Sequence, residues 1–227
     1  MHITWLGQAG LLFETDQTSI IIDPYLSNSV ASVQPQNYRR VPVDEKFLSI
    51  KPSVIIITHS HLDHFDKETL KNYLNDNSEV TVLSPSSVWS EIRQFGGNKN
   101  NYVLFNNGTV WSENGFEYRA VKAEHSDEYS IGVIINFNGK NYYVTGDTLY
   151  NEKVLLSLPK VRFEAVFLPI NGKGNNMNAA DAVKFATRLR TKYVVPIHFG
   201  LFDSLTGKEL LLNNKIIPTV YKEIELI

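Results

Sequence analysis

The hydrophobic positions in the first quarter of the chain predict three short β-strands. The segments HITWL (2–6), GLLFET (10–15) and SIIID (19–23) are rich in β-branched and aromatic residues, and turn-forming residues separate them. Both features are typical of strands joined by tight turns. We therefore expect an antiparallel meander at the start of the fold.

The strand-like pattern of apolar residues is absent between Ser27 and Phe47, a polar stretch that contains two prolines. Connections of this length are uncommon without a function, and many act as lids over a site. The segment KPSVIIIT (51–58) follows. Its apolar residues are continuous rather than alternating, which predicts a strand buried on both faces.

Downstream, the period of the apolar residues changes repeatedly between that of a helix and that of a strand. Asp66 and Asn178 precede two amphipathic segments and are predicted N-caps, and Asn138-Gly139 predicts a hairpin turn. Strand blocks that alternate with helices indicate an α/β fold with a sheet core. We expect helices at 65–74, 87–95, 151–160 and 178–190. We expect strands near 80–84, 164–170 and 192–198, and a β-rich stretch from 102 to 145.

Composition favours one folded domain over residues 1–227. Hydrophobic residues make up 43% of the chain and charged residues 20%, as in proteins that bury a core. The net charge of -2 predicts neither nucleic-acid nor membrane binding. The expected partner is therefore a small-molecule substrate. A homo-oligomer is also allowed. The first residues lack a basic segment followed by an apolar run, so we expect a cytoplasmic protein.

Half of the six histidines lie in the stretch ITHSHLDHF (57–65). Side chains two residues apart on an extended chain point to the same side, so His59 and His61 can hold one ion. The chain then turns into a helix, which directs Asp63 and His64 to a second point nearby. The chain has no cysteine, so any metal must bind through nitrogen and oxygen atoms.

Three further candidates stand where an apolar strand gives way to a polar loop. They are His125, Asp147 and His198, and Gly146 before Asp147 would let the backbone approach a site closely. Asp23 ends another apolar segment. We consider it both as a carboxylate partner for a ligand histidine and as a simple turn residue before Pro24.

This combination resembles the metallo-β-lactamase-fold hydrolases, whose signature is H-x-H-x-D-H followed by His, Asp and His at strand ends. The segments WLGQAGLLFE, DPYLS, THSHLDHFD, TGDT and PING...NAADA...VVPIHF look most like the L-ascorbate-6-phosphate lactonase branch and its uncharacterised relatives. Neighbouring branches often have a histidine where Gln8 stands. The resemblance implies a four-layer αββα sandwich of two mixed β-sheets flanked by helices.

The resemblance also implies a binuclear metal site. His59, His61 and His125 would hold one ion, Asp63, His64 and His198 the other, and Asp147 would bridge them. Zn, Mn and Fe all suit such ligands, and the lactonase branch implies manganese. A metal-bound hydroxide would attack the substrate, with Asp63, His61 and Asp147 as the catalytic residues.

Two loops offer candidate substrate contacts. Tyr38, Arg39 and Arg40 could fold over the metals and hold a phosphate or carboxylate, or could form a solvated basic pair. Asn171 and Lys173 precede a helix whose N-terminus could attract an anion. The leading hypothesis is a hydrolase of a small anionic substrate, such as a sugar-acid lactone phosphate or another ester.

Three alternatives stay open. The first is a phosphodiesterase or nuclease of the same fold, which the net charge of -2 disfavours. The second is a redox protein with a di-iron site and a flavin partner. The third is a metal-binding protein without turnover. The redox alternative needs a flavin-binding domain that this short chain lacks, and the sequence leaves the metal-binding protein without turnover open.

Overall fold

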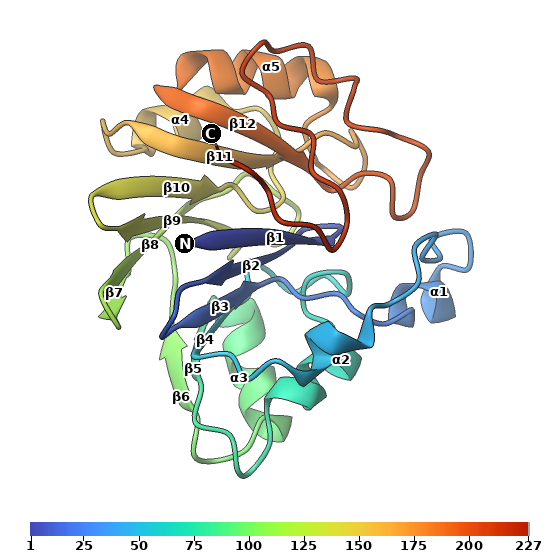
Figure 1. The fold of residues 1–227 in the computed structure, drawn as a ribbon, viewed down its shortest axis with the longest axis vertical. Helices are drawn as coiled ribbons and strands as arrows, with labels where there is room; N and C mark the ends of the chain where they lie inside the picture. Colours follow the sequence, from blue (N-terminus) through green and yellow to red (C-terminus); the bar gives the residue numbers. More distant parts are fainter. Residues whose placement is uncertain (227) are drawn as a thin grey trace.

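Two six-stranded β-sheets form the centre of the computed structural model, which describes residues 1–226 (Figure 1). The first sheet has the strands in chain order, with an antiparallel β1–β2–β3 meander followed by parallel pairs from β3 to β6. Its strands are β1 (His2–Gly7), β2 (Gly10–Glu14), β3 (Ser19–Ile22), β4 (Val54–Ile56), β5 (Thr81–Ser84) and β6 (Asn101–Leu104). The predicted meander is confirmed.

The second sheet runs in the order β12-β11-β10-β9-β8-β7, with parallel pairing only among β10, β11 and β12. Phe137 pairs with Lys140 across the predicted Asn138-Gly139 turn, so the hairpin is confirmed. The strands are β7 (Val110–Glu113), β8 (Phe116–Lys122), β9 (Ile131–Phe137), β10 (Lys140–Val144), β11 (Phe163–Pro169) and β12 (Thr191–Ile197).

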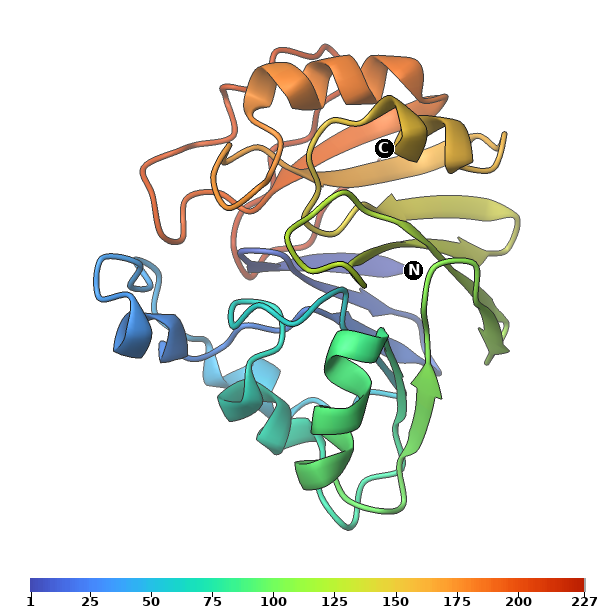
Figure 2. The same cartoon turned by 180° about the vertical axis from the view of Figure 1, so that it is seen from behind.

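Helices cover the outer faces of both sheets, which gives the expected αββα layering (Figures 1 and 2). The predicted caps are confirmed, because Asp66 accepts a hydrogen bond from the Glu68 N–H and Asn178 accepts one from the Asp181 N–H. The helices are α1 (Ser29–Val33), a 3-10 helix η1 (Glu45–Ser49), α2 (Lys67–Tyr73), α3 (Ser86–Phe95), α4 (Glu152–Ser157) and α5 (Ala179–Arg188). The polar stretch from Ser27 to Phe47 thus contains α1 and the beginning of η1.

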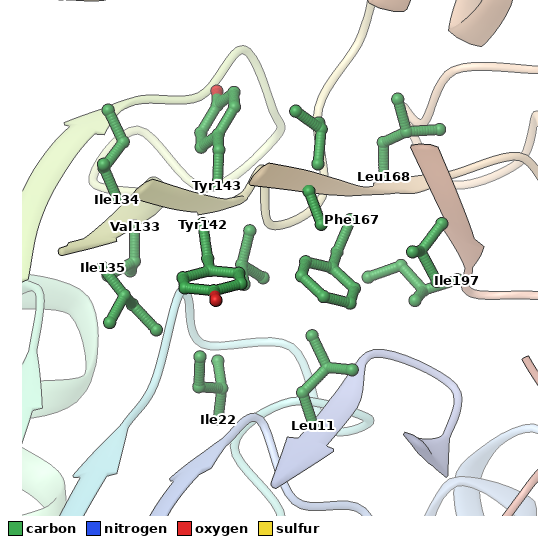
Figure 3. Close-up of a cluster of buried hydrophobic side chains, with 14 of the residues drawn as sticks. Leu11, Ile22, Val133, Ile134, Ile135, Tyr142, Tyr143, Phe167, Leu168 and Ile197 are labelled. Atoms are coloured by element: carbon green, nitrogen blue, oxygen red, sulfur yellow. The ribbon is translucent and has the colours of Figure 1, made fainter. Parts of the chain in front are cut away.

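The alternation of side chains along a strand divides the core between layers. Leu11 and Phe13 of β2 point between the sheets, whereas Leu12 packs in the cluster beneath the helices of the first sheet. Leu11 and Ile22 face Phe167 and Tyr142 across this interior (Figure 3). The two sheets are therefore held firmly face to face, which fixes the positions of their strand ends.

Within residues 1–226, no helix combines the length and the apolar character that a bilayer crossing requires.

Candidate metal centre and its cleft

Seven potential ligands meet where strands of the two sheets end. His59, His61, Asp63 and His64 follow β4, His125 follows β8, Asp147 follows β10 and His198 follows β12 directly. Their ligand atoms form two groups, each with all atoms within 4.8 Å of one another. The first group is His59, His61, His125 and Asp147, and the second is Asp63, His64 and His198.

Asp147 touches both groups. Its Oδ1 lies 3.3 Å from His64 Nε2, and its Oδ2 lies 3.2 Å from His198 Nε2 and 3.9 Å from His125 Nε2. One carboxylate therefore lies between two sets of imidazoles. Gly146 makes the close approach possible, since its φ is +62° and a Cβ there would lie 2.5 Å from the Ile131 carbonyl oxygen.

Asp23 fixes the orientation of the second group from behind. Its Oδ2 accepts hydrogen bonds from His64 Nδ1 at 2.8 Å and from the Thr58 hydroxyl at 2.5 Å, and its Oδ1 accepts the Thr58 N–H at 2.8 Å. Because the Nδ1 proton of His64 is used in this contact, Nε2 is left to bind a cation. Asp23 is thus a carboxylate partner of His64, one of the potential ligands.

In His59 and His125, the ring nitrogen Nδ1 contacts an oxygen atom outside the two ligand groups. His59 Nδ1 lies 3.1 Å from the Thr58 hydroxyl oxygen, and His125 Nδ1 lies 3.2 Å from the Asn175 carbonyl oxygen. Nε2 of His59 is buried and has no hydrogen-bond partner among the described residues. A buried imidazole lone pair that points into a cluster of ligands is costly unless a cation binds it. The residues therefore fit a metal ion.

The electrostatics of the two groups differ. Burial lowers the pKa of His59 far below its usual range and also lowers the pKa of His125, so both rings are neutral and able to bind a metal. Burial acts in the same direction on His198, but Asp147 and Asp63 outweigh it and raise its pKa to about 10. A cation bound by the second group would replace the proton of His198 as the partner of these carboxylates.

The carboxylates are held in the ionised form. Burial alone would raise the pKa of Asp63 and Asp147. Neighbouring His64 and His198 lower both values below the usual range of an aspartate. Both side chains can therefore bind cations or accept hydrogen bonds near neutral pH.

Three residues of the centre adopt left-handed backbone conformations. Gln8, Asp23 and His198 have φ values of 50°, 44° and 57°. Such conformations are uncommon outside glycine and are often found at functional sites, where the surrounding structure maintains them. Here the Gln8 carbonyl accepts the His198 N–H at 2.7 Å and the Trp5 indole N–H at 3.0 Å, which joins β1 to the end of β12.

Two amides contact the ligands and were not among the sequence candidates for site residues. Gln8 Nε2 donates to Asp63 Oδ2 at 2.8 Å and lies 3.1 Å from His198 Nδ1. Asn176 Nδ2 donates to Asp147 Oδ2 at 2.8 Å. Both lie in segments that stand out in the sequence, the first glycine-containing turn and the loop NGKGNNMN, but amides have no signature of their own.

An open cleft of about 350 Å³ lies over this centre. Four potential ligands line it, namely His61, Asp63, Asp147 and His198, and we call them the floor of the cleft. Asn171, Lys173, Gly174 and Asn176 form the polar lining. Val30, Val33, Leu62 and Phe202 form the apolar lining, and Gln8, Gln34, Asn37 and Asp203 complete the surface.

The sequence candidates for substrate contacts fall into two sets. Asn171 and Lys173 line the cleft, whereas Tyr38, Arg39 and Arg40 are not among its lining residues within residues 1–226. The Arg39 guanidinium donates to the carbonyl oxygen of Tyr25 at 2.5 Å and of Val41 at 3.2 Å and to the Tyr221 hydroxyl at 2.6 Å. In this structure Arg39 therefore fastens the long loop to the body of the protein.

A family model described as a beta-lactamase superfamily domain matches residues 2–198, a range that includes every member of both ligand groups. The chain belongs to this superfamily. The metallo-β-lactamase sandwich that the sequence resemblance implies is therefore confirmed.

Known proteins of similar length match most of this chain. The "UPF0173 metal-dependent hydrolase" of Geobacillus thermodenitrificans is 28% identical over 213 residues, which cover 90% of this chain and 88% of that protein. A structure of a possible metal-dependent hydrolase from Veillonella parvula has a TM-score of 0.77 at 16% identity and covers 99% of this chain and 98% of its own. The structure of isothiocyanate hydrolase from Delia radicum gut bacteria has a TM-score of 0.76 at 18% identity. The match covers 99% of this chain and 98% of that protein. At these identities the two structures show the shared fold alone.

Proposed function

We propose that this chain is a metal-dependent hydrolase that cleaves a lactone or another ester of a small anionic molecule. The observation that carries the proposal is the position of Asp147, which contacts both ligand groups and is one of the residues that line an open cleft. A metal held only for structure is usually closed off by its protein ligands, whereas a catalytic site keeps access for substrate and water.

The two groups would hold one divalent ion each, with zinc or manganese as the first choices and iron as a third. The ligand set of imidazoles and carboxylates fits all three. When bound, such ions acidify water and polarise the oxygen of the scissile bond. We assign His61 and Asp147, which both line the cleft, to holding the ions next to the bound substrate, as the sequence analysis also expects.

Asp63 is assigned the proton transfer. It is ionised, it lines the cleft, and Gln8 holds its Oδ2, so its orientation is fixed before substrate arrives. In this position it can accept the proton of the attacking water and return it to the leaving oxygen. Asn176 keeps Asp147 oriented by the same kind of amide contact.

Lys173 and Asn171 are assigned the anionic part of the substrate. Lys173 is the only lysine or arginine among the residues that line the cleft within the described chain. A single ammonium group can hold one carboxylate or one phosphate. This assignment is compatible with the L-ascorbate-6-phosphate lactonase branch and also with simpler acidic esters. Such substrates are small metabolites, in agreement with the expected cytoplasmic location.

The experiment begins with metal analysis of the purified protein by mass spectrometry. The protein, loaded with zinc or manganese, is then tested on lactones, thioesters and phosphodiesters, RNA included. We expect turnover of lactones or esters and none after chelation. Turnover confined to RNA or to other phosphodiesters would favour the phosphodiesterase alternative. Two bound ions without turnover of any class would favour a non-catalytic metal protein.

A further inference from the structure

The lining of the cleft is chemically uneven. On the apolar lining, Val30 and Phe202 pack with Tyr25 and Leu201 in a small hydrophobic cluster of their own, separate from the two large cores. The rings of Tyr25 and Phe202 meet edge to face with centroids 5.6 Å apart. Because the cluster is packed from behind, its side of the cleft is formed before any ligand binds.

Val33 extends this surface toward solvent. It ends α1, and its side chain is 68% exposed although it lines the cleft. Single exposed apolar side chains are ordinary on protein surfaces. An exposed valine that continues a packed apolar surface inside a cleft is different, because together they form a concave area that a ligand can cover.

The apolar lining begins beside the reacting centre. Leu62 stands in the chain between His61 and Asp63, and Phe202 follows His198 by four residues. Both side chains line the same cleft as these ligands. A substituent attached directly to a scissile ester on the floor would therefore reach the apolar lining without a spacer.

Charge outside the floor is nearly balanced. Lys173 and Asp203 contribute one charge of each sign to the lining. The Asp203 carboxylate is already engaged, since its Oδ1 accepts the N–H groups of Gly200 at 2.8 Å and Leu205 at 2.9 Å. Besides the metal ligands and Lys173, the cleft thus presents mostly amides and hydrocarbon, which suits a substrate of low charge.

We infer that the substrate carries an alkyl or aryl group next to its scissile ester or lactone bond, and that this group lies on Val30, Val33, Leu62 and Phe202. The inference rests on the proposed hydrolase function, and it narrows the substrate to amphipathic acids and their esters. A polyhydroxylated sugar lactone would leave this surface in contact with hydroxyl groups and would lose the favourable burial.

The test measures binding and turnover separately. Butyrate and octanoate, which resemble hydrolysis products, are titrated into the metal-loaded protein by calorimetry. Partial burial of a methylene is worth about twofold in affinity, so octanoate should bind roughly tenfold more tightly than butyrate. In parallel, γ-lactones without and with an alkyl chain are compared by their kcat/KM, which should rise with chain length.

Val33→Ser should reduce the octanoate-to-butyrate ratio at least threefold. The matched control is Leu156→Ser, because Leu156 is 78% exposed on α4 and is not a lining residue of the cleft. It should leave the ratio unchanged. Lys173→Ala should weaken both acids together and preserve the ratio, since it removes only the charge contact.

Equal binding of the two acids, or a ratio that Val33→Ser does not alter, would overturn the inference even if lactones are hydrolysed. Conversely, tight octanoate binding without turnover of any ester would overturn the proposed function and leave the apolar subsite standing. The two failures are therefore distinguishable.

Discussion

The floor of the cleft is held by buried hydrogen-bond partners, whereas its apolar and polar linings are more exposed. Behind the floor, Asp23, Thr58 and Gln8 form a buried hydrogen-bonded network with the second ligand group. The linings have far fewer such supports. Lys173 is exposed, and Val33 extends from a helix of five residues.

The difference separates chemistry from selectivity. Ligands must be held in a fixed geometry, so they are placed on a rigid scaffold and oriented by buried partners. Loops can change without disturbing that scaffold, so contacts with the variable part of a substrate are placed there. Mutations of the floor should therefore affect turnover and metal content, and mutations of the linings should affect which substrate is used.

The largest effects are expected at the floor itself. His61→Ala or Asp147→Ala should lower hydrolysis about a thousandfold or more and reduce the bound metal, because the stabilisation that the ions give to developing charge is lost. Metal content by mass spectrometry and circular dichroism would be measured with the activity. His2→Ala is the control, since His2 is exposed at the start of β1. Full activity of a metal-free variant would contradict the assignment.

A smaller but still large effect is expected at Asp23, which contacts the potential ligand His64. Asp23→Asn should reduce metal affinity or activity by about 10- to 100-fold, because it weakens the contact that orients His64. Competition with a chromogenic chelator would measure the affinity. Thr58→Ser keeps the hydroxyl that donates to Asp23 and should stay near the wild-type value.

Gln8 allows the role of one amide to be isolated. Gln8→Gly removes the contact with Asp63 but tolerates the φ of 50° and keeps the backbone carbonyl that His198 and Trp5 require. Loss of one hydrogen bond to a charged group should lower kcat by roughly tenfold. An unchanged kcat would show that Asp63 is oriented without Gln8.

On the polar lining, Lys173→Ala should raise KM for an anionic substrate about fivefold and leave kcat nearly unchanged. The effect is modest because Lys173 is exposed and its charge is screened by salt. Steady-state kinetics at two ionic strengths would measure it. The increase in KM should shrink at high salt and should be absent for a neutral lactone.

The smallest effect on catalysis is expected in the long loop. Arg40→Ala should leave KM within about twofold, since Arg40 is outside the lining of the cleft. Arg39→Met should instead lower the free energy of unfolding by about 2 kcal/mol, because partly buried hydrogen bonds to two carbonyl groups and one hydroxyl are lost. Urea unfolding separates the two variants. A large change in KM for Arg40→Ala, with normal stability, would show that the loop around Arg40 contacts the substrate after all.

Much of the fold could be predicted from local patterns. The meander, the Asn138-Gly139 hairpin and the caps at Asp66 and Asn178 depend on residues close together in the chain, so their signals are complete within a few positions. The candidate ligands could also be predicted, because imidazole and carboxylate groups at the ends of apolar strands have few other uses. Their assembly into two groups follows from the pairing of strands far apart in sequence.

What the sequence by itself determined is most of the helices and strands, α1 and η1 excepted, and the chemistry of the candidate ligands. Only the tertiary structure decided that Gln8 reaches His198 across 190 positions, that Arg39 binds carbonyl groups rather than lining the cleft, and that Val33 and Phe202 share one surface. The physical reason is that periodicity and capping are short-range properties, whereas the partner of a long polar side chain depends on which distant backbone folds against it.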